Sequence, residues 1–195
     1  ELNHTDAVIL CGGMGKRLKA ITGVSPKVMV KIAGRPFLDI LLEYAFQEGI
    51  RRVVLCTGYQ AGMIEEYYRK YDGEMTIEFS REKEPLGTGG AVKHARRFIQ
   101  SDSFIVFNGD SFCAVNLRKL VAFHERRKAI ATLSISQVKG SQDFGLITTD
   151  ALNRIKKFQE KVEIRTKAYV NAGVYCFQKN IFDFMPAAKR FSIEK

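Results

Sequence analysis

Glycines and cations directly follow an apolar run near the start of the chain. Residues 7–11 are apolar, and Gly12, Gly13, Gly15 and Arg17 come soon after them. An apolar run that ends in glycines is typical of a buried strand that leads into a loop. The backbone N–H groups of such a loop, assisted by a guanidinium, can bind the oxygens of a phosphate. The spacing therefore predicts a phosphate-binding loop.

A plain turn between a strand and a helix is the alternative interpretation of the Gly12-Gly13 pair. Arg17 and, further on, Lys27 favour phosphate binding, because both supply positive charge. Two well-known phosphate loops are excluded by the spacing. A P-loop needs Ser or Thr where this chain has Arg17, and a dinucleotide fingerprint needs a third glycine where it has Leu18. The loop is therefore predicted to be a phosphate cradle of another kind.

A carboxylate follows a second apolar run. Residues 103–108 read as a buried strand that stops at Asn108-Gly109-Asp110. A carboxylate just past the carboxyl end of a central strand lies in the crevice where open α/β sheets bind ligands. Asp110 is therefore the predicted Mg²⁺ ligand, since this ion prefers oxygen donors. A simple Asn-Gly-Asp turn is the alternative, and it is weaker once the first glycine loop is placed at the same sheet edge.

A second glycine-rich loop is predicted at residues 82–90, Glu-Lys-Glu-Pro-Leu-Gly-Thr-Gly-Gly. It leads into a helix expected at residues 91–99. Its glycines would permit the close approach of backbone to a flat ligand. Both glycine loops are then expected to meet Asp110 at one edge of the sheet.

The elements that must position these residues alternate along the chain. Strands are expected at 7–11, 52–57, 74–81 and 103–108, and helices at 36–48, 61–71, 91–99 and 117–127. This order predicts an α/β fold with a doubly wound, mixed, mainly parallel sheet. In the helix at 61–71, Glu65 and Arg69 are expected to face water as an i,i+4 pair.

The C-terminal third is predicted to be rich in strands. They are expected at 131–138, 145–148, 154–159 and 169–177. No Ser/Pro-rich linker separates this region from the preceding one. We therefore expect a single domain over residues 1–195, with a nucleotide-binding part at about 1–128 and a second part at about 129–195.

Composition narrows the classes of function. The formal net charge is +10, but basic and acidic residues are interleaved, so an anionic small substrate explains the charge as well as nucleic acid does, and no nucleic-acid partner is expected. No apolar run is long enough to span a bilayer and the start is polar, which predicts a cytoplasmic protein without membrane partners. The four cysteines lie far apart and are predicted to be reduced and mostly buried: Cys11, Cys56, Cys113 and Cys176.

The segment Leu-Cys-Gly-Gly-Met-Gly-Lys-Arg-Leu at residues 10–18, with Ser25-Pro26-Lys27, resembles the signature of the sugar-nucleotide pyrophosphorylases. These nucleotidyltransferases join a sugar 1-phosphate to a nucleoside triphosphate and release pyrophosphate. The resemblance extends over nearly the whole chain. It implies a Rossmann-like nucleotidyltransferase fold whose strand-rich C-terminal third binds the sugar.

The resemblance also implies roles for individual residues. Arg17 would clamp the leaving phosphates, Lys27 would bridge the triphosphate and the sugar phosphate, and Asp110 would bind Mg²⁺. The residues implied in nucleotide binding are Leu10, Gly12, Gly13, Gly15, Arg17, Glu82, Pro85, Gly87 and Asp110. Those implied in sugar-phosphate binding are Gly145, Glu160, Lys161 and Asn171. For Glu160 and Lys161, a solvated ion pair is the alternative.

Glu82 suggests which base is bound. Relatives that use thymidine or uridine triphosphate usually have glutamine at this place, whereas a carboxylate accepts from both N1–H and N2–H of guanine. We therefore hypothesise a guanylyltransferase that uses GTP, with a solvated acidic loop of Glu82 and Glu84 as the alternative.

The loop at 82–90 and the segment Asn-Gly-Asp-Ser-Phe most resemble the branch that acts on D-glycero-α-D-manno-heptose 1-phosphate. Such an enzyme supplies GDP-heptose for bacterial surface polysaccharide. Mannose 1-phosphate, or another sugar 1-phosphate, is the alternative substrate, and a non-catalytic nucleotide-binding regulatory homologue is the alternative class. A homo-oligomer is left open.

One part of the family pattern is missing from this sequence. The family takes a second magnesium carboxylate from an Ile-Asp-Ile-Gly-like segment, and nothing after Pro186 matches it. We expect that carboxylate to lie beyond Lys195, in a chain truncated at its C-terminus. The alternative is that Asp110 and substrate phosphates hold Mg²⁺ by themselves.

Overall fold

Parallel strands form the centre of the computed structural model, which describes residues 1–13, 25–141, 145–159 and 164–194. They are β1 (Asp6–Leu10), β4 (Arg52–Thr57), β5 (Thr76–Arg81) and β6 (Ser103–Asn108). Their order across the sheet is β5-β4-β1-β6, and all neighbours are parallel. The predicted doubly wound, mainly parallel arrangement is confirmed.

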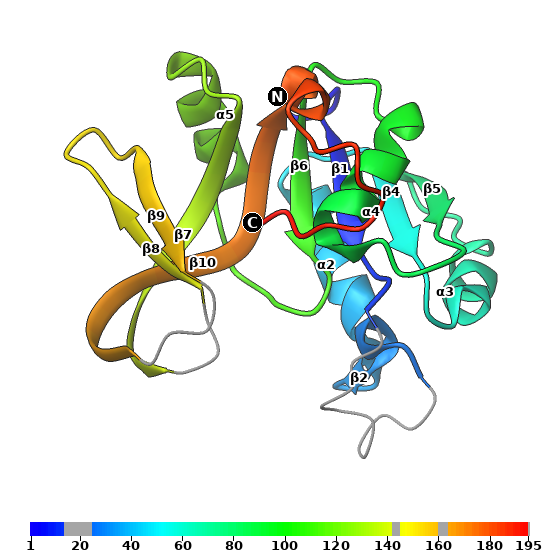
Figure 1. Ribbon diagram of the computed structural model, residues 1–195. Coiled ribbons are helices and arrows are strands. Elements are labelled where there is room, and N and C mark those ends of the chain that lie inside the picture. The colour runs from blue at the N-terminus through cyan, green and yellow to red at the C-terminus, as the bar shows by residue number, and fades with distance from the viewer. Residues whose placement is uncertain (14–24, 142–144, 160–163, 195) are drawn as a thin grey trace.

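Helices cover both faces of this sheet (Figure 1). On one face lie α2 (Phe37–Gln47), α3 (Ala61–Tyr68) and α5 (Leu117–Arg126), and on the other lies α4 (Gly87–Ala95). Ala7 and Ile9 of β1 belong to the core under the first group, and Val8 belongs to the core under α4. Because both faces are buried, β1, β4 and β6 are continuous apolar runs, whereas β5 at the edge of the sheet alternates.

The remaining strands form an antiparallel extension of the same sheet. They are β7 (Ala131–Ser141), β8 (Leu146–Thr149), β9 (Ile155–Gln159) and β10 (Ile164–Gln178). The end of β10 pairs with β6, while its earlier part pairs with β8 and bends away from the central strands (Figure 1). β7 pairs along β10, with a register shift between Asn171 and Tyr175. The strand-rich C-terminal third is therefore continuous with the central sheet.

Short elements complete the described chain. A hairpin of β2 (Lys31–Ile32) and β3 (Arg35–Pro36) precedes α2, and short 3-10 helices occur at η1 (Lys27–Met29), η2 (Arg96–Phe98) and η3 (Lys179–Asp183).

Helix α4 begins at Gly87, so the end of the predicted glycine loop is helical. Residues 189–194, which we call the C-terminal strap, cross this part of the helix. A Cβ atom at Gly89 would overlap the ring of Phe191, and one at Gly90 would overlap the carbonyl oxygen of Lys189. The prediction that these glycines admit a flat ligand is wrong for Gly89 and Gly90, because a segment distant in sequence fills that space.

In helix α3 the predicted i,i+4 pair is present, with Arg69 Nη2 3.8 Å from Glu65 Oε2, and Arg69 is exposed, but the expected exposure of Glu65 is wrong. Glu65 is buried, not solvated, and its Oε1 accepts a hydrogen bond from Thr57 Oγ1 at 3.1 Å. Arg81 approaches its other oxygen at 3.6 Å. The side chain is buried because it closes over the polar end of β4, an interaction that helical periodicity cannot reveal.

The cysteines are as predicted. All four are free, and Cys11, Cys56 and Cys176 are buried, while Cys113 is partly exposed. Burial raises the pKa of the Cys11 and Cys56 thiols well above the ordinary value. Such thiols stay protonated and unreactive at neutral pH.

Asp6, at the start of β1, holds three segments together. It is 1% exposed, and its carboxylate accepts from Arg52 Nε at 2.9 Å and from the backbone N–H of Ser101 at 2.8 Å. Asp6→Ala would leave these donors without a partner, so we expect the free energy of unfolding to fall by about 3 kcal/mol. Urea denaturation measures the change. Asp102→Ala, at an exposed position, is the control, and an equal effect of the two substitutions would contradict the prediction.

His124 makes the stability depend on pH. It is buried on α5, with Nδ1 2.9 Å from Thr132 Oγ1, and burial lowers its pKa below the ordinary 6.5. Between pH 6.5 and the lowered value, the unfolded chain binds a proton that the folded chain does not, so stability falls as the pH falls. We expect urea denaturation at pH 7.5 and 5.5 to show a larger loss for the parent chain than for His124→Leu. Parallel losses would argue against this role.

Candidate nucleotide-binding cleft

A cleft of about 340 Å³ opens at the carboxyl ends of β1 and β6. Leu10 and Asn108, the last residues of these strands, are paired across the sheet, and Gly109 N donates to Leu10 O at 3.1 Å. The strand order reverses between β1 and β6, which is the place where open α/β sheets bind ligands. The residues that line the cleft are Leu10, Gly12, Gly13, Glu82, Pro85, Gly87, Thr88, Ala91, Asn108, Gly109, Asp110, Arg190 and Glu194.

Most of the residues predicted to bind nucleotide lie in this one cleft. Those that line it are Leu10, Gly12, Gly13, Glu82, Pro85, Gly87 and Asp110. Gly15 and Arg17 lie outside the described residues, as do Glu160 and Lys161 on the predicted sugar side. The structure thus brings together segments up to a hundred positions apart in the sequence.

The first glycine loop is held by the neighbouring strand. Cys11 N donates to Cys56 O at 2.9 Å, which continues the β1–β4 pairing past Leu10. A Cβ at Gly58 would lie 3.2 Å from the Cα of Gly12, so these two backbones are closely packed. A Cβ at Gly13 would meet no described residue within 4 Å, so no described part of the chain covers it. Gly13 therefore offers accessible backbone to a ligand.

Glu82 lies beside this loop. Its Oε1 would be 3.4 Å from a Cβ at Gly12, and its Oε2 accepts from Leu86 N at 3.1 Å. Within the described chain, Oε1 accepts no hydrogen bond. Burial raises the pKa of the Glu82 carboxyl above its usual value. The cleft therefore contains a partly buried carboxylate with one oxygen available to a ligand's donors.

Lys27 and Asp110 form an ion pair next to the cleft. Lys27 Nζ lies 2.8 Å from Asp110 Oδ2, and both side chains are partly exposed. An exposed ion pair contributes little to stability, so Lys27 and Asp110 can each leave the pair and bind a ligand with little loss of free energy. Gly109 keeps Asp110 close to β1, because a Cβ there would overlap the carbonyl oxygen of Leu10.

The oxygen donors at the end of β6 fit a divalent cation. Asn108 Oδ1 is buried and has no hydrogen-bond partner among the described residues. Asp110 supplies a carboxylate two positions on, while the described residues contain no cluster of three or more His, Cys, Asp or Glu. A single carboxylate suits Mg²⁺ bound partly by substrate phosphates, as this ion commonly is.

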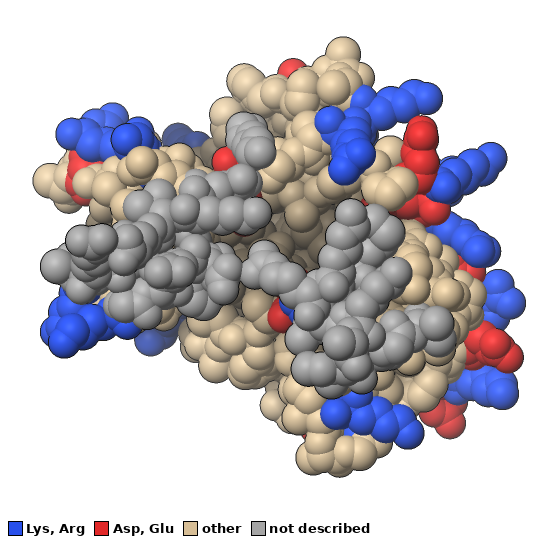
Figure 2. All heavy atoms as spheres, turned by 60° about the horizontal axis from the view of Figure 1, so that its bottom comes forward, with Lys and Arg blue, Asp and Glu red and all other residues tan. Residues whose placement is uncertain are grey.

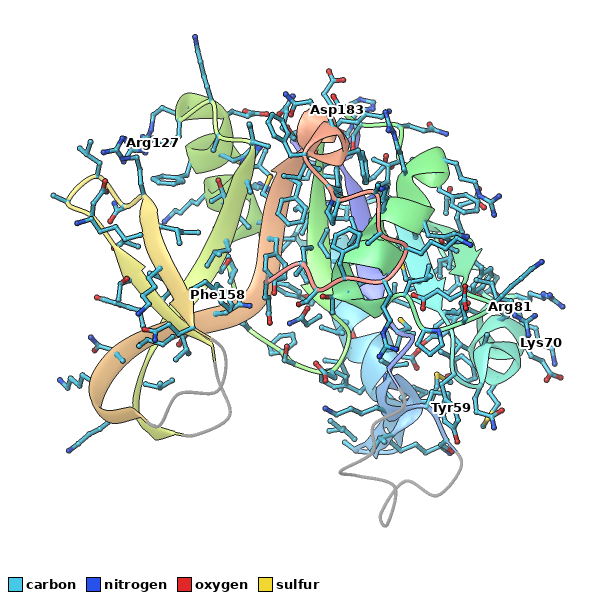
Figure 3. The ribbon with its side chains drawn as sticks, viewed as in Figure 1. Tyr59, Lys70, Arg81, Arg127, Phe158 and Asp183 are labelled. Carbon is cyan, nitrogen blue, oxygen red and sulfur yellow. The ribbon has the colours of Figure 1, made fainter. Side chains whose placement is uncertain are left out.

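The predicted sugar-side residues Gly145 and Asn171 are adjacent. Asn171 N donates to Gly145 O at 3.0 Å, and a Cβ at Gly145 would lie 2.8 Å from the ring of Phe158 on β9 (Figure 3). The Asn171 amide donates to Tyr175 OH at 2.7 Å and to Glu194 Oε1 at 2.6 Å. Because Glu194 lines the cleft, this pair is joined to the cleft through it.

Sequence reasoning missed four polar residues in the cleft wall: Thr88, Asn108, Arg190 and Glu194. An excess of basic residues in the C-terminal part was a signal for Arg190. No signal in the sequence pointed to Glu194, because the carboxylate that the family pattern requires near the C-terminus belongs to an Ile-Asp-Ile-Gly-like segment. The positions of Thr88 and Glu194 in the cleft depend on the contact between α4 and the strap, and no local sequence pattern predicts that contact.

Charge is spread around the molecule. Figure 2 shows Lys and Arg side chains around the periphery of one face, with Asp and Glu among them on one side and a hollow near the centre. In the described part of the chain, no helix combines the length and apolar character that crossing a bilayer requires.

Comparison with known proteins places the chain in a family. Residues 6–192 match the family described as Nucleotidyl transferase. D-glycero-alpha-D-manno-heptose 1-phosphate guanylyltransferases are 39% identical in Aneurinibacillus thermoaerophilus and 35% identical in Campylobacter jejuni. Both alignments cover 97% of this chain, with 82% and 83% of the relatives. The mannose-1-phosphate guanylyltransferase of Mycobacterium tuberculosis is 36% identical over 99% of this chain, which spans 54% of that protein.

The crystal structure of HddC from Yersinia pseudotuberculosis has the same fold. It superimposes with a TM-score of 0.87 at 34% identity, covering 97% of this chain and 83% of HddC. HddC has also been solved in complex with GMP-PN, with a TM-score of 0.86. The chain belongs to the nucleotidyl transferase family, as the resemblance of its glycine loop and Pro26-Lys27 predicted.

Proposed function

We propose that this protein is a guanylyltransferase that joins GTP to D-glycero-α-D-manno-heptose 1-phosphate, yielding GDP-heptose and pyrophosphate for bacterial surface polysaccharide. The observation that carries the proposal is that Gly12, Gly13, Glu82 and Asp110 line one cleft, with Lys27 beside it. Relatives of similar length bear the names of heptose 1-phosphate guanylyltransferases, and the HddC complex contains a guanine nucleotide analogue.

The reaction follows from the placement of charges. A phosphate oxygen of the sugar 1-phosphate attacks the α-phosphorus of GTP in line, and the bond to the pyrophosphate oxygen breaks. Lys27, which pairs with Asp110, is proposed to hold the two anions together. Asp110 would hold Mg²⁺, which when bound would neutralise charge on the triphosphate and on the leaving pyrophosphate. Arg17 is proposed to bind the leaving phosphates. Asn171 and Gly145, with Glu160 and Lys161, are proposed to bind the sugar and its phosphate.

Glu82 is the proposed guanine-binding residue. Its Oε1, which accepts no hydrogen bond within the described residues, and its Oε2, which accepts from Leu86 N, form an acceptor pair for the N1–H and N2–H groups of guanine. Mannose 1-phosphate is the second candidate sugar, because the M. tuberculosis mannose enzyme matches this chain at 36% identity.

A pyrophosphate-release screen tests the function. GTP, UTP, CTP and ATP are each combined with heptose, mannose and glucose 1-phosphates in the presence of Mg²⁺. We expect the highest kcat/KM for GTP with D-glycero-α-D-manno-heptose 1-phosphate. A preference for mannose 1-phosphate would change the proposed sugar substrate but leave the proposed guanylyltransferase reaction unchanged. GTP binding without release from any pair would favour the non-catalytic homologue.

The affinity for GTP should depend on the ionisation of Glu82. Burial raises the pKa of this carboxyl, and only the ionised form accepts both guanine donors. As the pH falls toward the raised pKa, the protonated fraction grows, so the KM for GTP should increase. Initial rates from pH 8 down to 5.5 measure this rise. Glu82→Gln cannot ionise and should show a flatter profile; a rise of equal size in both proteins would contradict the assignment.

A further inference from the structure

The C-terminal strap is hydrogen-bonded to the nucleotide side of the cleft. Phe191 N donates to Leu86 O at 3.0 Å, and Phe191 O accepts from Gly89 N at 3.0 Å and Gly90 N at 3.3 Å. Ile193 N donates to Thr88 Oγ1 at 2.9 Å. The bond from Gly89 N satisfies one of the N–H groups at the start of α4 that have no partner within the helix.

The fit between the strap and α4 depends on glycine. Gly87 has a φ of +73°, and a Cβ there would lie 2.5 Å from Phe191 O. At Gly89 and Gly90 a Cβ would overlap Phe191 and Lys189. Any side chain at these places would push the strap away, so the position of the strap is set by the same loop that contains Glu82 and Pro85.

The other end of the strap reaches the sugar side. Glu194 N donates to Ser192 Oγ at 3.2 Å, and Glu194 Oε1 accepts from Asn171 Nδ2 and from Tyr175 OH. The amide oxygen of Asn171 accepts from Gly173 N at 3.0 Å. The orientation of the Asn171 side chain is therefore fixed jointly by its own strand and by Glu194.

We propose that Thr88 and Glu194 are positioning residues that make the geometry of Asn171 depend on the nucleotide loop. Thr88 fixes Ile193, the next residue fixes Asn171, and a change at the start of α4 reaches the sugar side through this chain of contacts. This inference rests on the proposed function, because it takes Asn171 as a sugar-binding residue.

Substitutions at Thr88 give the sharpest test. Thr88→Val keeps the shape but removes the acceptor of the Ile193 N–H, whereas Thr88→Ser keeps the hydroxyl. We expect Thr88→Val to raise the KM for the sugar 1-phosphate about three- to tenfold and to raise it by a larger factor than the KM for GTP, and Thr88→Ser to restore the parent KM for the sugar 1-phosphate. Thr76→Val, at an exposed position on β5, is the matched control. Glu194→Ala should act like Thr88→Val, and Glu194→Gln, which keeps an acceptor oxygen, should recover part of the loss.

A second measurement does not need turnover. The side-chain NH₂ resonances of Asn171, identified by their loss in Asn171→Ser, report its hydrogen bonds. They should shift in Thr88→Val and stay in place in Thr76→Val. If Thr88→Val raises only the KM for GTP, or leaves the Asn171 resonances unchanged, the positioning role is wrong. If the parent chain releases no pyrophosphate with any of the substrate pairs, the proposed function fails. The NMR comparison still decides whether Thr88 positions Asn171.

Discussion

Asp110→Asn is expected to lower kcat/KM for pyrophosphate release about 10²- to 10³-fold. The carboxylate of Asp110 lies at the end of β6, paired with Lys27 at 2.8 Å, where the triphosphate is proposed to bind. Its replacement by a neutral amide removes the anionic ligand for Mg²⁺ and leaves Lys27 without its counterion. Rates measured as a function of Mg²⁺ concentration should show a lower maximum and a higher Mg²⁺ requirement.

Asp102→Asn is the control for this experiment. Asp102 is exposed and lies just before β6, at the end of the strand opposite Asp110, so its side chain does not reach the cleft. Its substitution should change the rate less than twofold. If Asp110→Asn kept more than a third of the activity at saturating Mg²⁺, Asp110 would not be the metal ligand.

The second large effect concerns the base. Glu82→Gln should lower kcat/KM for GTP about 100-fold, because one of two acceptors is replaced by an N–H₂ group that faces a guanine donor. The same substitution should raise kcat/KM for UTP, since an amide offers the donor and the acceptor that a pyrimidine edge requires. Competition of GTP with UTP in one reaction, with the products separated, measures the change in preference.

Glu84→Gln is the matched control. Glu84 is in the same loop and carries the same charge, but it is exposed and does not line the cleft. It should leave the ratio of GTP to UTP use unchanged. An unchanged ratio in Glu82→Gln would remove the guanine assignment and leave the nucleotidyltransferase assignment intact.

The central strands could be predicted from sequence because both faces of the sheet are buried. Residues 52–57 and 103–108 are apolar runs with clear ends, and the structure has β4 and β6 at these bounds. The cleft followed from the same reasoning, since parallel strands bring their carboxyl ends to one edge. That is why Leu10 and Asp110, a hundred positions apart, could be placed together before any contact was known.

Interactions between distant segments could not be predicted in this way. Glycines normally weaken a helix, so helical propensity argues against the observed start of α4 at Gly87. The strap compensates because Phe191 O accepts hydrogen bonds from Gly89 N and Gly90 N in the first turn of that helix. Glu65 was misplaced for a related reason, because its burial depends on Thr57 and Arg81 of neighbouring strands. Local periodicity contains no information about such partners.

The bend in β10 has a mechanical consequence. One strand of 15 residues pairs with β6 of the central sheet and with β8 of the outer hairpin, so no loose linker separates the central sheet from that hairpin. A movement of the outer hairpin relative to the central sheet must therefore bend a hydrogen-bonded strand, whose pairing with β7 is interrupted between Asn171 and Tyr175, where Gly173 has a φ of +75°. The bending of β10 and the orientation of the Asn171 side chain thus depend on the same residues. A more flexible strand would therefore also hold the Asn171 side chain less precisely in place.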